Sequence, residues 1–277
     1  MSKAAQWMLI VLLTGCARQT PMPTAAYPTT NPTSATETYM QIDTTTRDKL
    51  ESILTTRQTQ PPLDAGSAIA HISQQFLGTP YVADRLVGSA TLPEKLVVDF
   101  RGLDCFTYLD YVEALRHANT QQQFVQRLIA TRYINGEVRF LKRKHFFSDW
   151  AHQPEIIAKD ITTQLSPHAI TLEKHLNQKA DGSQYLAGLP NVTRSVSYIP
   201  GGYVDQQLLN QLRTGDYIGI YSHLNGLDVT HVGIYVMTPE GPMLRNASSR
   251  EHNHRVVDSP FIDYVLATPG IIVLRPL

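Results

Sequence analysis

The pattern of apolar residues changes near residue 137, and this change restricts the possible folds more than any other feature of the chain. Before it, apolar residues recur at intervals of three and four, which predicts helices. After it, short apolar runs are separated by Gly, Pro, Asn and Asp, which predicts strands and turns. Helices followed by a series of strands are typical of an α+β domain with an antiparallel sheet.

The individual elements follow from caps, stop signals and periodicity. Helices are expected over residues 48–58 and 65–76, from Asp104 onward, and over 120–131. Strands are expected over residues 139–142, 195–199, 216–221, 231–237, 243–246 and 270–274. Residues 145–150 suggest an aromatic-rich loop, and residues 154–195 suggest one helix at most and much loop.

The N-terminus has the features of a processed leader. Lys3 precedes the apolar run 7–13, which is shorter than the roughly 20 residues that a membrane-spanning helix needs. The run ends in Leu13-Thr-Gly-Cys16, which resembles a bacterial lipobox, where the leader is removed and the new N-terminal cysteine carries lipid. The residue after Cys16 is Ala17 rather than aspartate, which resembles lipoproteins that are sorted to an outer membrane. An ordinary secretory leader is the alternative.

These features predict three segments. Residues 1–15 form the signal peptide, and residues 16–46 comprise the lipidated Cys16 and a tether rich in Thr, Pro, Ala and Ser. Residues 47–277 form the catalytic domain, placed in the cell envelope and facing the periplasm. The chain has 24 basic and 24 acidic residues, so its formal net charge of zero argues against a nucleic-acid partner.

Cys105 is the first candidate for chemistry. The chain has two cysteines, and if Cys16 is lipidated then Cys105 has no intramolecular partner. Asp104 is a suitable N-cap, which places Cys105 in the first turn of a helix. A helix start favours a thiolate and offers backbone amides to an oxyanion. A buried structural cysteine is the alternative.

His231 and Asn246 are the candidate partners of Cys105. In the strand 231–237, His231 lies on the face opposite the aliphatic residues at 232, 234 and 236. Asn246, on the next expected strand, could accept a hydrogen bond from the imidazole and fix its tautomer. Cysteine, histidine and asparagine then supply nucleophile, base and orienting group.

Several motifs resemble those of a known family. Gly78-Thr-Pro-Tyr81, Asp104-Cys105 at a helix start and Thr230-His-Val-Gly-Ile-Tyr-Val236 are similar to the NlpC-type cell-wall peptidases, a papain-like group. Within that group, the chain resembles the N-acetylmuramoyl-L-alanine amidase-like family. The motifs of this closer resemblance are Leu103-Asp-Cys-Phe-Thr-Tyr108, Lys144-His-Phe-Phe-Ser-Asp-Trp150 and Leu227-Asp-Val-Thr-His231.

The resemblance implies a Cys105-bearing helix packed on an antiparallel sheet that supplies His231 and a polar third residue. It implies hydrolysis of an amide bond in peptidoglycan or its muropeptides without a cofactor, and an active-site role for Tyr81. The chain departs from the broader group at Phe106-Thr107, where Ser-Gly is usual, and at Asn246, where histidine is common. Both the muramoyl–L-alanine amide and a stem-peptide bond such as γ-D-glutamyl–diaminopimelate therefore stay open.

Other interpretations are weaker. His145 either lines the substrate cleft or caps a packed loop, and the second is favoured. His252 and His254 could bind a metal, but the sequence offers no third ligand beside them, so no metal site is expected. Two alternative functions are a lipoprotein that binds peptidoglycan without cutting it and a hydrolase or transferase acting on another amide or a lipid ester.

Overall fold

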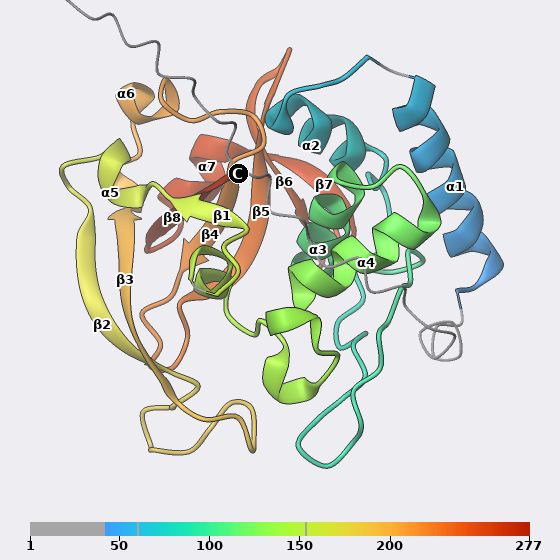
Figure 1. Ribbon diagram of the computed structural model, residues 1–277. Helices are drawn as coiled ribbons and strands as arrows, with labels where there is room; N and C mark the ends of the chain where they lie inside the picture. Colours follow the sequence, from blue (N-terminus) through green and yellow to red (C-terminus); the bar gives the residue numbers. More distant parts are fainter. Residues whose placement is uncertain (1–41, 60, 153) are drawn as a thin grey trace, which may run out of the picture.

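The computed structural model describes residues 42–59, 61–152 and 154–277 and contains one antiparallel sheet flanked by helices. The eight-stranded sheet has the order β2-β3-β8-β4-β5-β6-β7, and β1 pairs with β8 off this path. The helices α1 to α4 gather on one side of it in Figure 1. The strands are β1 (Ala158–Asp160), β2 (Ile170–Leu176), β3 (Val192–Pro200), β4 (Tyr217–Tyr221), β5 (Val229–Thr238), β6 (Gly241–Ala247), β7 (Val256–Pro260) and β8 (Gly270–Pro276).

The longer helices come first in the chain, and short helices connect the strands. The α-helices are α1 (Thr44–Thr59), α2 (Ala65–Gln74), α3 (Cys105–Arg116), α4 (Gln121–Arg132), α5 (Thr162–Leu165), α6 (Gln206–Leu209) and α7 (Phe261–Leu266). Two 3-10 turns that matter below are η3 (Phe140–Lys142) and η4 (Phe147–Ala151). The mixture of helices and strands and the antiparallel sheet confirm the coarser part of the expected fold class, an α+β domain with an antiparallel sheet.

Strand alternation divides the interior into two apolar cores. Val232 and Ile234 of β5 pack in the core that includes α1 to α4. Tyr235 of the same strand packs in a second core with Leu244 of β6 and Phe261 of α7. Since side chains alternate across a strand, the sheet is covered by helices on both faces.

The structure confirms the four predicted helices and the strands over 195–199, 216–221, 231–237, 243–246 and 270–274, with small changes at their ends. The predicted strand over 139–142 is wrong, because this segment forms η3, with the Arg143 amide donating to the Phe140 carbonyl. β1, β2 and β7 were not expected, although β2 and β7 are complete partners in the sheet.

The folded part begins before residue 47. Asp43 caps α1 by accepting a hydrogen bond from the Thr46 amide, and Ile42 is 7% exposed in the core. Residues 42–46 therefore belong to the folded part rather than to the expected tether. The rest of the tether and the leader, including Cys16, lie outside the described residues. Among the described residues, no helix combines the length and apolar character that crossing a bilayer requires.

Candidate active site

Cys105 is the first residue of α3, and the helix start is fixed by Asp104. The Asp104 carboxylate accepts hydrogen bonds from the backbone amides of Phe106 at 3.0 Å and Thr107 at 2.7 Å. The Thr107 hydroxyl in turn accepts from the Asp104 amide, which completes a capping box. The predicted N-cap is thus confirmed. Its carboxylate faces the helix amides, while the half-buried Cys105 packs at the edge of the first core.

The surroundings of the Cys105 sulfur favour the thiol over the thiolate. Burial and the neighbouring charge of Asp104 raise the pKa of Cys105 to about 12, and the backbone N–H groups of Val232, Cys105 and Phe106 act in the opposite direction. The expectation that a helix start would lower the pKa of Cys105 is therefore wrong. Three amides that favour the charged form do not offset the loss of solvation and an adjacent carboxylate.

His231 lies near the start of β5 and shares a cavity of about 240 Å³ with Cys105. Its Nε2 atom is 3.0 Å from the Asn246 Oδ1 atom, so the hydrogen bond expected from the sequence is present. Burial lowers the pKa of His231, and the nearby Arg250 charge adds to this effect. The ring is therefore neutral at neutral pH, as a general base must be.

The contacts of Asn246 determine which imidazole nitrogen carries the proton. The Asn246 Nδ2 atom donates to the Leu244 carbonyl at 2.9 Å and to the Ser259 hydroxyl at 3.3 Å. With its amide nitrogen facing two oxygens, Asn246 must turn Oδ1 toward the ring, and the ring must donate through Nε2–H. The other ring nitrogen, Nδ1, then keeps a lone pair that can accept a proton.

Gly233 allows Asn246 to approach the His231 strand. A Cβ atom on Gly233 would lie 2.7 Å from Leu244 Cδ1 and 3.1 Å from Asn246 Cβ. The glycine therefore makes room for the neighbouring strand, whereas the sequence suggested that it leaves space beside the His231 ring. Asn246 itself is fully buried.

The cavity beside Cys105 has a mainly apolar wall. Phe146 and Phe147 of the aromatic segment contribute to it, and so does His145. The His145 Nε2 atom is 2.7 Å from the Phe140 carbonyl oxygen, and its ring packs edge-on against Phe140. Thus His145 both stabilises its loop and lines the cavity, which combines the two roles that the sequence left open.

Tyr81 lies beside the same centre. Burial raises the pKa of its hydroxyl, and negative charge on Cys105 and Asp104 acts in the same direction, which requires all three groups to be close. Its ring packs 5.4 Å from the ring of His254, and its amide donates to the His254 carbonyl. His254 thus packs against Tyr81, and among the described residues no group of three or more His, Cys, Asp or Glu side chains could hold a metal ion.

The sequence did not identify three further residues at this centre. The ring of Tyr264 in α7 lies 6.2 Å from the His231 ring with the two planes inclined by 25°, and the Arg250 guanidinium covers the Tyr264 ring at 4.1 Å. Burial raises the pKa of Tyr264, and negative charge on Cys105 adds to the shift. Asp228 is buried and lines the cavity. No sequence signal pointed to Tyr264, but the Leu227–His231 motif already contained Asp228.

Comparison with known proteins identifies the family. The sequence matches the model of the N-acetylmuramoyl-L-alanine amidase-like proteins, called AmiA-like, over residues 71–271. The chain belongs to the AmiA-like family. The matched region includes Cys105, His231 and Asn246, and it confirms the family that the motifs suggested.

One solved structure supports the assignment of this AmiA-like protein, and a second one shares its fold. An N-acetylmuramoyl-L-alanine amidase from Bacteroides uniformis is 27% identical, with a TM-score of 0.66, and the match covers 77% of this chain and 99% of that one. A Legionella pneumophila protein assigned to the family model DUF1460 is 23% identical, with a TM-score of 0.71, covering 84% and 95% of the two chains. The second likeness concerns the fold alone. The comparison with curated proteins found no match.

Proposed function

We propose that this AmiA-like protein is a peptidoglycan hydrolase that cleaves the muramoyl–L-alanine amide with Cys105 as nucleophile and His231 as base. One observation carries the proposal: Cys105 and His231 line one cavity, in which the His231 Nε2 atom lies 3.0 Å from the Asn246 Oδ1 atom. Family membership and the name of the Bacteroides uniformis neighbour support the substrate class.

In the proposed reaction, the proton moves from sulfur to His231 during the attack. Since the pKa of the resting thiol is raised, the Nδ1 lone pair removes the thiol proton as the sulfur bonds to the amide carbonyl. The backbone N–H of Cys105 is the oxyanion donor at the helix start, because Asp104 occupies the amides of Phe106 and Thr107. The imidazolium then protonates the leaving amine, and the C–N bond breaks.

The second half of the reaction regenerates the enzyme. His231, again neutral, removes a proton from water as the water oxygen attacks the thioester carbonyl of Cys105. The C–S bond breaks, the thiolate takes back a proton from the imidazolium, and the carboxylic acid product leaves and loses its own proton to solvent. Asn246 keeps the ring aligned through both halves but contributes no negative charge to stabilise the imidazolium.

The arrangement also supports a papain-like fold of the NlpC type. A helix that begins with Cys105 packs on an antiparallel sheet, one strand supplies His231, and the adjacent strand supplies a polar third residue. We assign residues 42–277 to this domain.

We further propose that residues 1–15 are a leader and that Cys16 carries lipid on the mature protein. Anchoring would hold the domain in the cell envelope, at the outer membrane and facing the periplasm, with peptidoglycan within reach of the tether. The support is the Leu13-Thr-Gly-Cys16 sequence followed by Ala17. Cys16→Ser should abolish lipid labelling and release the protein from the membrane fraction. A variant that is still lipid-labelled in that fraction would refute the anchor.

Digestion of purified muropeptides tests the proposed reaction. Wild-type protein should release intact stem peptides from the muramoyl sugar, as seen by mass spectrometry, and Cys105→Ala should release none at equal folded concentration. Cleavage inside the stem peptide would show that the protein is an endopeptidase rather than an amidase. Equal activity of Cys105→Ala would refute the cysteine mechanism, and binding without any cleavage by the wild type would refute the hydrolase.

A further inference from the structure

Asp228 occupies an unusual position next to the candidate active site. It lies three residues before His231, is 2% exposed, and lines the cavity together with Cys105. A buried carboxylate loses solvation, so it needs hydrogen-bond donors around it. Two backbone amides donate to the Asp228 carboxylate.

The carboxylate of Asp228 joins two separate segments. Its Oδ2 atom accepts from the Ser148 amide of η4 at 2.8 Å, and its Oδ1 atom accepts from the Val229 amide, the first of β5, at 2.8 Å. η4 carries Phe147, and the neighbouring Gly219 leaves space for that ring, because a Cβ there would lie 2.6 Å from it. One side chain therefore links the aromatic wall of the cavity to the strand that carries His231.

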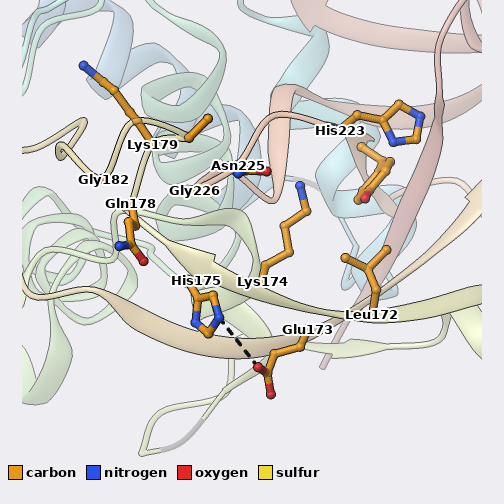
Figure 2. A pocket seen from close by; sticks show the side chains of 12 residues that line it. Leu172, Glu173, Lys174, His175, Gln178, Lys179, Gly182, His223, Asn225 and Gly226 are labelled. Atoms are coloured by element: carbon orange, nitrogen blue, oxygen red, sulfur yellow. Dashed lines mark ion pairs between the residues drawn. The ribbon is translucent and has the colours of Figure 1, made fainter.

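Lys174 holds the same loop through a second set of hydrogen bonds. Its ammonium group donates to the backbone carbonyls of Ser222, Leu224 and Leu227, the last two at 2.9 and 2.8 Å. Figure 2 shows the Lys174 side chain extending from its strand toward the loop that bears His223, Asn225 and Gly226. Lys174 is 6% exposed, and three carbonyl acceptors satisfy its three protons. The loop over residues 222–228 is thus fixed at both ends.

We propose that Asp228 is a positioning residue that, with Lys174, fixes the start of β5 against the aromatic segment 146–150 and thereby sets the geometry of the Cys105–His231 pair. This inference rests on the proposed cysteine mechanism. The general base must stay within hydrogen-bond reach of the thiol, and a displacement of about 1 Å can reduce a rate by about 10²-fold. The aromatic wall and the His231 strand cannot shift relative to each other without breaking the hydrogen bond between the Ser148 amide and Asp228.

Positioning can be separated from a direct electrostatic role. Burial and Arg250 lower the pKa of His231 and the Asn246 hydrogen bond raises it, whereas both Asp228 oxygens accept hydrogen bonds from backbone amides. Removing its charge should therefore change the turnover number but leave the pH midpoint of His231 in place. A residue that stabilised the imidazolium would shift that midpoint.

The test compares Asp228→Asn and Asp228→Ala with Asp216→Asn in the full-length protein. Asp216 is a matched control because it is 1% exposed and accepts from Arg275 and the Arg213 amide. It precedes Tyr217, whereas His231 pairs with Ile220 near the other end of β4. The measurements are kcat and KM on muropeptides, the melting temperature, and the rate at which iodoacetamide alkylates Cys105.

We expect kcat per folded molecule to fall about 10- to 100-fold in Asp228→Ala. Asp228→Asn should lose less, because its amide oxygen retains one of the two acceptors. KM should change less than threefold, and the acidic midpoint of kcat/KM should stay the same. Alkylation of Cys105 should accelerate at least threefold, because a loosened wall admits water to the sulfur. Asp216→Asn should lower only the melting temperature.

Two results would overturn the inference. The first is a kcat per folded molecule in Asp228→Ala equal to that of the Asp216→Asn control, with unchanged alkylation. The second is a shift of the pH midpoint, which would make Asp228 an electrostatic partner of His231. Failure of the proposed function is recognised separately: wild type and Cys105→Ala would then not differ in activity. In that case the alkylation rates alone decide whether Asp228 positions the wall around Cys105.

Discussion

The orienting role of Asn246 leads to a quantitative prediction for Asn246→Ala. The substitution removes the acceptor that faces His231 Nε2 at 3.0 Å, so the ring can carry its proton on either nitrogen and can rotate. A ring protonated on Nδ1 cannot accept the thiol proton. A hydrogen bond of this kind is worth roughly 1.4 to 3 kcal/mol, which corresponds to about a 10- to 150-fold loss of turnover.

The same substitution also destabilises the protein, so rate and stability must be measured on one preparation. The Leu244 carbonyl and the Ser259 hydroxyl lose their donor, at a cost of about 1–3 kcal/mol in the free energy of unfolding. Turnover of a purified muropeptide is therefore normalised to the folded fraction from a thermal melt. His231→Ala should be nearly inactive, and Asn246→His should recover part of the activity of Asn246→Ala.

A lower melting temperature with turnover per folded molecule within threefold of the wild type would refute the orienting role. Asn246 would then only satisfy backbone and hydroxyl groups where β6 meets β7. Because the asparagine is fully buried, the matched readouts separate these two possibilities without any assumption about substrate binding.

Three further predictions concern the same centre. Burial lowers the pKa of His231, so the imidazole stays neutral into mild acid and the acidic midpoint of kcat/KM should lie below pH 6.5. A midpoint above pH 6.5 would contradict a buried, neutral ring. The pKa of Cys105 is raised from 9.0 to about 12, so its thiolate fraction at pH 7 is about 10³-fold below that of an ordinary cysteine. Alkylation of Cys105 should therefore be correspondingly slow, and its rate should rise about tenfold per pH unit up to pH 9. A plateau in this rate below pH 8 would indicate a preformed thiolate. Gly233→Ala should cost about 1–3 kcal/mol in the free energy of unfolding and lower kcat, because its Cβ would meet Leu244 Cδ1 at 2.7 Å and displace the strand that holds Asn246. As a control, Gly202→Ser at an exposed position, where a Cβ meets nothing within 4 Å, should change neither the free energy of unfolding nor kcat.

The predictable parts of the site are those that depend on local sequence. The Asp104 carboxylate caps the helix that it precedes, and Cys105 is the next residue, so the position of Cys105 at the helix start follows from adjacent residues. The spacing of apolar residues in β5 also fixes which face His231 takes. The hydrogen bond between His231 and Asn246 was foreseen because the two residues lie on consecutive strands joined by a short turn.

The parts that were missed depend on contacts distant in sequence. β2 escaped recognition because a charged residue, Lys174, occupies one of its inward positions, where alternation normally shows an apolar side chain. The lysine is tolerated there only because three carbonyls from a loop some 50 residues later bind it. Tyr264 reaches His231 from α7, which begins directly after Pro260, and no local periodicity reveals that meeting. The pKa of Cys105 was predicted in the wrong direction because burial is a tertiary property.

Intact-protein mass spectrometry of acid-quenched reactions tests the central claim most directly. Cleavage of the muramoyl–L-alanine amide through Cys105 predicts a transient mass increase equal to the muramoyl glycan, located on the peptide that contains Cys105, while the stem peptide leaves first with its amine free. The increase should be absent in Cys105→Ala and should persist longest in variants that slow the water step. Turnover without any adduct on Cys105, or an adduct that carries the stem peptide instead of the sugar, would contradict the proposed chemistry.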